Sequence, residues 1–562
     1  MKNKYKIILI ICVIIGICSI LVGSIAYYRI VVEGNIKAST GNAVFVLKDE
    51  NSNVWNNKEI NLGKVNPGDS GSFTVTMDAS GSTVDMYATL EIDRGTLPTN
   101  LKFYTTSDHK SELHKYYSFL EKSGTSSETL TIYWYWNPYI SDEEDSKFIN
   151  VSNLEANIRV SAVQISEYAM MKNGYNGSYA FWGATYKPYI RTITFGNDLS
   201  NLPSECTEEN LCWDVSYSST QNKKVYGYLI DSGIVIEETD TSTSTTTTKT
   251  LYNLYIVSEA PIFAPINSRY LFDSFKNTIS IEFNDNFNTS KVTNMEWLFR
   301  NCSSLSSIDL NRFNTASATT MERLFFRCSS LEKIDFSSFN TSQVVNLAGM
   351  FTFCSSLTSL ELSSINTSKV TDMSAMFSWC SSLESLDLNG FNTSNVTNMG
   401  QMFYKCLSLT NLDLSSFNTS KVNDMNSMFS YCTSLTSLDL SNFNTKNVSK
   451  ITSMFCGCSS LTNLDLSNFN TSKITMYGYG TNTGSGMFSG CSKLTTTINI
   501  MNGDITEYYS MFFNAATETS AQITVNYIAS LDTIAEGETQ SLIDKIIATK
   551  SSNSNIVKGK QL

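Results

Sequence analysis

A long phrase repeats along the second half of the chain, and it constrains the fold more than any other feature. Its clearest marker is a cysteine that returns at a constant interval from Cys302 to Cys458, with Cys491 following after a longer interval because of an insertion around Gly478 to Gly484. A fixed period of this kind is typical of a solenoid, in which each repeat forms one coil packed on its two neighbours. The marker cysteines are Cys302, Cys328, Cys354, Cys380, Cys406, Cys432, Cys458 and Cys491.

The two halves of each repeat have different periodicities. Residues 308–310 alternate apolar, acidic and apolar, which predicts a short strand. The steps of three and four from Val292 through Met295 and Phe299 to Cys302 predict an apolar stripe on a short helix. The predicted fold of residues 287–494 is therefore an α/β leucine-rich-repeat solenoid, with a parallel sheet on one side and short helices on the other.

An acidic residue recurs between the two aliphatic positions of each predicted strand and would face outward. One interpretation is a negatively charged stripe that binds a ligand, with Lys369, Lys421 and Lys473 at the neighbouring turns. The alternative is a solvated face that keeps the sheet soluble. Calcium is a third interpretation, although one carboxylate per coil is sparse for a site of six to eight oxygens. The candidate residues are Asp309, Asp335, Glu361, Asp387, Asp413, Asp439 and Asp465.

The cysteines divide into two groups. Those of the repeat end an apolar stripe and are expected to be buried, reduced thiols, and no Cys-x-x-Cys or histidine partner indicates zinc. Cys456 falls in a column of polar residues and is expected to face outward. Cys206 and Cys212 lie in a polar stretch and are the best disulfide candidate in an exported protein, with two free thiols as the alternative.

The repeat phrase Phe-Asn-Thr-Ser-x-Val-Thr-x-Met-x-x-Met-Phe-x-x-Cys-Ser-Ser-Leu-x-x-Leu-Asp-Leu resembles the 26-residue repeat of bacterial surface proteins of the BspA-like leucine-rich-repeat family. The resemblance covers at least Phe287 to Cys491. It implies a right-handed leucine-rich solenoid on a bacterial surface with an adhesive or host-interacting role, and it names no ligand.

The N-terminal segment has the pattern of a membrane anchor or a signal peptide. Three lysines within residues 1–6 precede an uncharged run from Ile7 to Tyr28, which is long enough to span a bilayer. The lysines predict an inside N-terminus. We therefore expect residues 1–28 to anchor a single-pass bacterial membrane protein with an extracellular C-terminal region, or a secreted protein if the chain is cleaved near Ala26.

Residues 29–165 predict a β-sandwich that acts as a stalk. Alternating apolar and polar residues at 72–76, 87–92 and 130–136, with turn residues such as Pro67-Gly68-Asp69 between strands, are typical of that fold. This segment is similar, more weakly, to TasA/camelysin-like exported proteins, a group that contains matrix fibre subunits and a reported protease. His109 and His114 are the only histidines, and no His-Glu-x-x-His motif supports a metalloprotease.

The segments that flank the repeats predict caps. Residues 166–286 are expected to form an N-terminal cap and divergent first coils, with Phe275 in the cysteine column. Thr239 to Thr250 consists almost wholly of threonine and serine and predicts a flexible loop. Residues 495–562 predict a C-terminal cap with closing strands and a short amphipathic helix near Ser541, followed by a mobile tail.

Composition and motifs narrow the classes of function. The net charge of −12 argues against a nucleic-acid partner. No Gly-x-Ser-x-Gly, Walker or Cys-His constellation occurs, so we expect neither an enzyme nor a cofactor or metal site. The favoured hypothesis is a cell-surface adhesion protein that presents the solenoid to an extracellular protein or glycan and contacts the membrane through residues 7–28. The alternative is a structural, matrix-forming surface protein that assembles through the β-sandwich.

Overall fold

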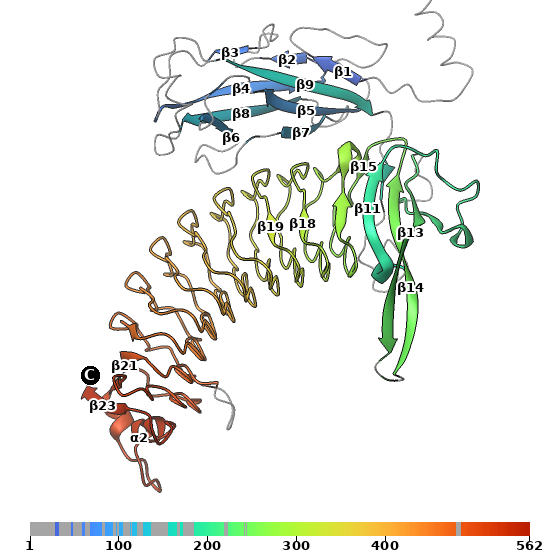
Figure 1. Ribbon diagram of the computed structural model, residues 1–562. Coiled ribbons are helices and arrows are strands. Elements are labelled where there is room, and N and C mark those ends of the chain that lie inside the picture. Colours follow the sequence, from blue (N-terminus) through green and yellow to red (C-terminus); the bar gives the residue numbers. More distant parts are fainter. Residues whose placement is uncertain are drawn as a thin grey trace, which may run out of the picture. The chain divides into compact units, whose positions relative to one another are not determined.

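The computed structural model of the chain consists of two compact units, residues 1–105 with 113–167, and residues 106–112 with 168–562 (Figure 1). Each unit is described by itself. The structure describes residues 29–32, 46–48, 59–61, 68–80, 85–93, 97, 101–104, 113, 115–120, 127–136, 155–165, 169–171, 185–217, 223–240, 242, 244–478 and 485–562.

The first unit contains two antiparallel sheets. The order of one sheet is β1-β9-β5-β7, with β3 also paired to β9, and the order of the other is β2-β4-β8-β6. Alternate residues such as Val75, Met77, Phe103 and Trp136 are buried, as the period of two predicts for strands with one covered face. The strands are β1 Arg29–Val32, β2 Val46–Lys48, β3 Glu59–Asn61, β4 Ser70–Asp78, β5 Asp85–Asp93, β6 Leu101–Tyr104, β7 Lys115–Leu120, β8 Ser127–Trp136 and β9 Glu155–Ile165.

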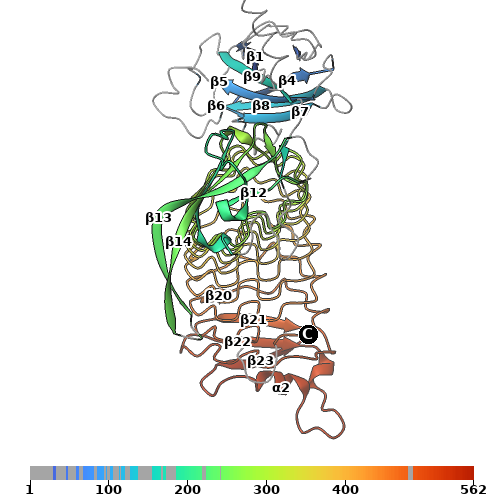
Figure 2. The same cartoon turned by 90° about the vertical axis from the view of Figure 1, so that its right-hand side faces the viewer.

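The second unit begins with a five-stranded sheet of order β12-β13-β14-β11-β16. Strands β13 and β14 continue beyond the sheet as a long antiparallel hairpin (Figure 2), in which Thr239 pairs with Thr246. The flexible loop predicted for Thr239 to Thr250 is therefore wrong, because β-branched threonines on both strands favour extended pairing. The strands are β11 Ile190–Gly196, β12 Cys212–Asp214, β13 Tyr226–Asp240, β14 Thr245–Val257 and β16 Ser280–Glu282.

Short parallel strands and many turns build the coils that follow. Successive coils lie side by side in chain order (Figure 1), and isolated parallel bridges link equivalent residues, for example Asn346 to Asp372 and Asp372 to Asn398. Short strands are assigned at the start and end of the array. They are β10 Ala169–Met170, β15 Ile262–Phe263, β17 Phe287–Asn288, β18 Ser307–Ile308, β19 Lys333–Ile334 and β20 Asn463–Leu464.

The predicted helices of the repeat are not formed, so the α/β assignment is wrong. The described residues are mostly strands and turns, and their only α-helix is α2 (Leu542–Ile547) near the C-terminus. The stripe predicted to be helical is nevertheless buried, since Val292, Met295, Phe299 and Cys302 are at most 1% exposed. A chain of tight turns brings these side chains inside just as a helix would. The spacing of apolar residues alone therefore does not distinguish a helix from a series of turns.

Backbone hydrogen bonds explain why the stripe is not a helix. The N–H groups of Met295, Trp297 and Phe299 donate to carbonyls of the next coil at 2.9–3.1 Å instead of to residues four positions back. The intervening N–H groups close turns within the coil, such as that of Arg300 to the carbonyl of Trp297 at 3.1 Å. The buried backbone is thus satisfied alternately within one coil and between two coils.

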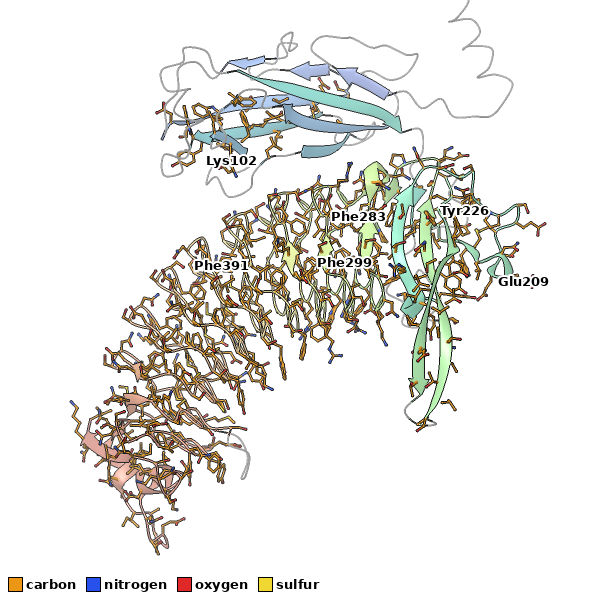
Figure 3. All side chains as sticks on the ribbon, in the orientation of Figure 1. Lys102, Glu209, Tyr226, Phe283, Phe299 and Phe391 are labelled. Carbon is orange, nitrogen blue, oxygen red and sulfur yellow. A yellow bond between two sulfur atoms is a disulfide. The ribbon has the colours of Figure 1, made fainter. Side chains whose placement is uncertain are left out.

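A continuous stack of phenylalanine rings fills the centre of the array. Phe325, Phe351 and Phe377 are fully buried, their ring planes lie within 8° of parallel, and their centroids are 5.8–6.0 Å apart. The stack continues from Phe272 to Phe512 through one ring in every coil. Figure 3 shows Phe299 and Phe391 among the side chains that fill the coils.

The marker cysteines line the same interior. Each thiol of this column is fully buried, and the Sγ of Cys380 donates to the carbonyl of Phe351 at 3.2 Å. Burial raises the pKa of the Cys380 thiol to about 12, so the group stays neutral. Cys456 is also buried, at 3% exposed, which corrects the prediction that it faces outward.

Buried threonines form a second connection between coils. The Oγ1 of Thr393 donates to the carbonyl of Asn418 at 3.1 Å and accepts the N–H of the same residue at 2.7 Å. Equivalent bonds join Thr367 to Asn392 and Thr419 to Asn444. These hydrogen bonds between coils explain why the Asn-Thr pair occupies the same position in every repeat.

The array ends in a four-stranded parallel sheet of order β20-β21-β22-β23. Helix α2 packs beside it (Figure 2) and is capped by Ser541, whose side chain accepts the N–H of Asp544. This confirms the short helix predicted near Ser541. The remaining strands are β21 Thr495–Ile500, β22 Ile523–Tyr527 and β23 Ile556–Gln561, and the last of these lies in the segment predicted to be a mobile tail.

The prediction of a single-pass membrane protein is corrected. In the described part of the chain, no helix is long and apolar enough to cross a bilayer. The expected anchor at residues 7–28 and the expected cleavage position near Ala26 lie outside the described residues.

Replacement of Thr393 by valine tests the threonine connection. Valine keeps the shape but removes the hydroxyl, which leaves the partly buried N–H and carbonyl of Asn418 without this partner, so we expect the free energy of unfolding to fall by about 1 kcal/mol. Thr393→Ser keeps the hydroxyl and should lose less. Equal losses in both variants, measured by denaturant titration, would contradict the assigned role.

Replacement of Lys187 by methionine tests the N-terminal cap. Lys187 is buried, and its Nζ donates to the carbonyl of Asp273 at 3.2 Å. Burial lowers the pKa of Lys187 from 10.5 to about 8, so between these values the unfolded chain binds more protons and stability rises with pH. We expect this rise to be present in the wild type and absent in Lys187→Met when unfolding is measured from neutral pH upward. Parallel curves would contradict it.

Candidate binding surface

The acidic row predicted from the sequence is exposed, and its carboxylates form turns. All seven residues are exposed, and each accepts the N–H of the residue two positions later, as Asp413 does from Ser415 at 2.9 Å. These N–H groups lower the pKa of the Asp413 and Asp439 carboxyls, and for Asp439 the charges of Asp413 and Asp465 oppose that effect. The row is Asp309, Asp335, Glu361, Asp387, Asp413, Asp439 and Asp465.

The lysines expected beside this row are held by neighbouring coils. The Nζ of Lys421 donates to Oδ1 of Asn395 at 2.7 Å, and that of Lys473 donates to Oδ1 of Asn447 at 3.0 Å. Lys369 makes the same contact with Gln343. These lysines therefore share a structural role between adjacent coils.

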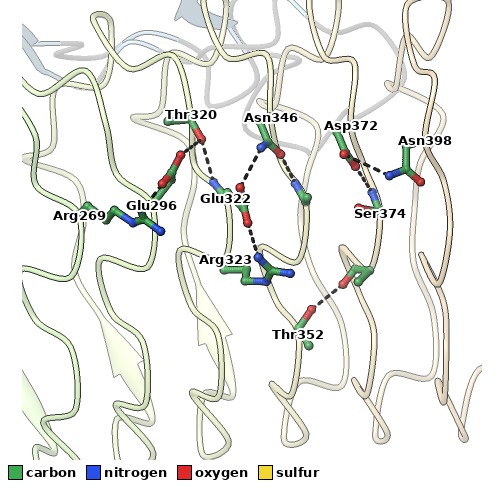
Figure 4. A network of polar contacts seen from close by, with 12 residues as sticks. Arg269, Glu296, Thr320, Glu322, Arg323, Asn346, Thr352, Asp372, Ser374 and Asn398 are labelled. Atoms are coloured by element: carbon green, nitrogen blue, oxygen red, sulfur yellow. Dashed lines mark hydrogen bonds and ion pairs between the residues drawn. The ribbon is translucent and has the colours of Figure 1, made fainter. Parts of the chain in front are cut away.

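The side chains of a second polar row form hydrogen bonds with one another and with the backbone. Thr320, Asn346, Asp372 and Asn398 lie at equivalent points of consecutive coils (Figure 4). The amide of Asn398 donates to Asp372 at 3.2 Å, and Asp372 also accepts the N–H of Ser374 at 2.8 Å. Contacts within the protein thus account for this row.

Cys206 and Cys212 form a disulfide beside the first sheet of the second unit, as the sequence predicts. In the described residues, no group of three or more histidine, cysteine, aspartate or glutamate side chains is arranged to hold a metal ion.

A different row carries the large side chains of the array. The residue directly before the marker cysteine is basic or aromatic in five consecutive coils. We call it the pre-cysteine row, and it consists of Arg327, Phe353, Trp379, Lys405 and Tyr431. Backbone hydrogen bonds join the row from coil to coil. The N–H of Phe353 donates to the carbonyl of Ser378 at 2.9 Å, and the N–H of Trp379 donates to the carbonyl of Tyr404 at 2.7 Å. This ladder of backbone hydrogen bonds fixes the spacing of the row.

The aromatic rings of the row are in contact along the array. The centroids of Phe353 and Trp379 are 5.2 Å apart with planes 26° from parallel. Tyr404, which precedes Lys405 and is not part of the row, bridges Trp379 and Tyr431. The centroid of its ring is 6.1 Å from the centroid of each of these two rings. Tyr431 is 38% exposed, and Phe353 and Trp379 are half-buried, so the rings offer partly open surface.

Two cations lie over these rings. The Nζ of Lys405 is 3.6 Å from the centroid of the Trp379 ring, and the Arg327 guanidinium is 5.2 Å from that of Phe353. Such contacts contribute about 0.5–2 kcal/mol each. Among the described residues neither Arg327 nor Lys405 forms an ion pair with a carboxylate, whereas Arg300 pairs with Asp273.

The row occupies backbone positions that favour glycine. Phe353, Trp379 and Tyr431 have φ of 65°, 61° and 61°, in the left-handed region where bulky residues are strained. Gly457 and Gly490 take the same position in the next two coils, with φ of 74°. The left-handed conformation belongs to the turn that each coil makes, since Asn301 and Lys405 share it, so large side chains are held at a position where the fold would accept glycine.

The pre-cysteine row could not be found by searching for residue types that repeat. In this column the residue type changes from coil to coil, while the strict columns all proved to be structural. The available signal was the size of these residues in a phrase whose other outward positions are mostly serine, threonine and asparagine.

Comparisons with known proteins relate the array to a family. Residues 267–386, 339–432, 379–484 and 408–527 match the family described as "Mycoplasma protein of unknown function, DUF285". These overlapping matches lie within residues 267–527, so the chain is similar to this family across its coils. The comparisons with curated proteins and with solved structures each gave no significant match. The resemblance to BspA-like repeats stays a prediction.

Two replacements of Asp413 test the turn-forming role of the acidic row. Asp413→Asn keeps an oxygen that accepts the Ser415 N–H but loses the charge, so we expect a slightly lower thermal midpoint at neutral pH, and Asp413→Ala, which also loses the acceptor, should lower it further. Because the pKa of Asp413 is lowered in the fold, its stabilisation is present at neutral pH and lost as the pH falls through that pKa. The difference between wild type and Asp413→Asn should therefore be present at neutral pH and disappear at acid pH, where the protonated carboxyl is a neutral acceptor like the amide.

Proposed function

We propose that the chain is a binding protein whose coils present a regular surface to an extracellular protein or glycan, with the pre-cysteine row as the contact surface. The observation that supports this most is the partly open run of Phe353, Trp379 and Tyr431, beside cations that pair with no carboxylate among the described residues. Rigid aromatic side chains give large contact area with little loss of conformational freedom, and they are frequent in binding surfaces.

The geometry favours a partner that contacts several coils over a partner that enters a single deep site. One side chain per coil contributes to the row, so a partner that extends along the array meets a new ring or cation in each coil. Several weak contacts held at fixed spacing raise the affinity together. The Cys206–Cys212 disulfide is typical of an oxidising compartment and accords with an extracellular partner.

A binding panel tests this proposal. The chain would be passed over immobilised polysaccharides and purified extracellular-matrix proteins, beside a Phe353→Gly/Trp379→Gly variant. Glycine suits the positive φ of both positions, so the variant should fold. We expect at least one probe to bind, and the variant to bind it at least about tenfold more weakly, since truncated aromatic anchors cost about 2 kcal/mol or more.

The matched control replaces Asp413 and Asp439 by asparagine, which removes charge from the acidic row and keeps its turns. We expect its binding to equal that of the wild type. Loss of binding in the control alone would move the contact surface to the acidic row, and the absence of any bound probe would contradict a binding function.

A further inference from the structure

We propose that two copies of the chain join edge to edge through the hairpin of β13 and β14. The outer half of this hairpin, residues 234–239 paired with residues 246–251, extends beyond the five-stranded sheet (Figure 2), and we call it the arm. Within the described residues, β11 pairs with β14 only from Tyr252 onward, and β12 pairs with β13 only as far as Tyr228. The arm is therefore a ribbon of two strands whose outer edges pair with no further described strand.

The arm exposes β-branched side chains on both of its faces. Val235 is 64% exposed and Ile234 is 41% exposed, and the threonines from Thr246 to Thr248 are exposed as well. Tyr189 contacts part of the arm, where its hydroxyl donates to Oε2 of Glu238 at 2.7 Å. An isolated ribbon of two strands is only marginally stable in water, and a third strand or a covering layer stabilises it. Further strand pairing would therefore stabilise the arm.

The two edges of the arm differ in how they are protected. Strand β13 has a bulge between Asp231 and Ile234, where Gly233 has φ of 73°, and it carries the exposed carboxylates of Glu237 and Glu238. Bulges and charges are the usual means by which an edge strand avoids pairing with another chain. The edge of β14 from residue 246 to 250 has four threonines, one lysine, no carboxylate and no proline. It is therefore the edge that is open to pairing.

This open edge is complementary to itself. When identical strands pair antiparallel about a two-fold axis perpendicular to the sheet, the axis passes through one residue, which faces its own copy. An axis at Thr248 uses the whole segment, since Thr246 then faces Thr250 of the second copy. Cross-strand threonine pairs are favourable. The arm already contains such a pair, because the Oγ1 atoms of Thr239 and Thr246 are 2.9 Å apart.

Charge selects the same arrangement. An axis at Thr248 places Lys249 opposite Thr247 of the second copy, and Glu238 is the neighbour of that threonine on the same face. Each lysine therefore approaches a carboxylate of the other copy. An axis at Lys249 would set two lysines opposite each other, and pairing through β13 would bring the glutamates of both copies together, and like charges in these positions repel. The order of strands in the dimer is β13-β14-β14-β13.

Two aspartate variants of the full chain test the pairing by sedimentation equilibrium. Thr248→Asp places two carboxylates opposite each other at the axis, so we expect the dimer to dissociate at least about tenfold more readily. Thr247→Asp is the matched control, because it also adds a carboxylate beside a glutamate of β13 but faces Lys249 of the second copy. We expect its dimer to be as stable as that of the wild type. Equal melting temperatures show that neither change unfolds the chain.

Disulfide cross-linking tests the same edge in the assembled dimer. Thr248→Cys should form a cross-linked dimer under mild oxidation, whereas Glu237→Cys on the other edge should not exceed the wild type. The free cysteines of the described residues are buried, so the wild type gives a low background from this part of the chain.

Four outcomes overturn the inference. They are a wild type that sediments as a monomer at every concentration, equal weakening of the dimer in both aspartate variants, a dimer without a cross-link at Thr248→Cys, and a stronger cross-link at Glu237→Cys. A monomer whose arm instead captures an extended peptide from the binding panel would assign the open edge to a different partner. None of these outcomes bears on the pre-cysteine row, so the proposed binding function is tested separately.

Discussion

The alternation of backbone hydrogen bonds between and within coils is the constraint on which the rest of the second unit depends. Each coil is too short to satisfy its own N–H and carbonyl groups, so alternate groups bond to the next coil. This requires the backbone to return to the left-handed region twice in most coils, as at Ala375 and Trp379. Threonine hydroxyls and stacked phenylalanine rings then hold the same register from coil to coil.

Much of this arrangement could be predicted from the sequence. The constant repeat period identified the coils, and the apolar columns identified the interior, including the buried Phe299 and Cys302. The helix could not be excluded, because turns and helices both place residues at steps of three and four on one side. Glycine at positions 349 and 457, where φ is positive, was the clue that the stripe is not helical.

The candidate surface was harder to predict for a physical reason. Residues that repeat strictly in a solenoid are those whose neighbours are the same in every coil, so they report packing and turns, as Asp413 and Thr393 do. A ligand contacts the coils from outside and imposes no such identity. Arg327, Trp379 and Lys405 differ in type; the repeat aligns their positions, but only the structure shows the contacts between their side chains.

The most direct test of the coil geometry is the stability of Ala375→Gly. Ala375 has φ of 53°, where alanine costs about 1–2 kcal/mol and glycine does not, although glycine's greater freedom in the unfolded chain offsets part of the gain. The turn coil therefore predicts a higher free energy of unfolding for the glycine variant. A helix at this position predicts the opposite sign, a loss of about 1 kcal/mol. A clear loss would contradict the coil geometry and, with it, the alignment of the pre-cysteine row.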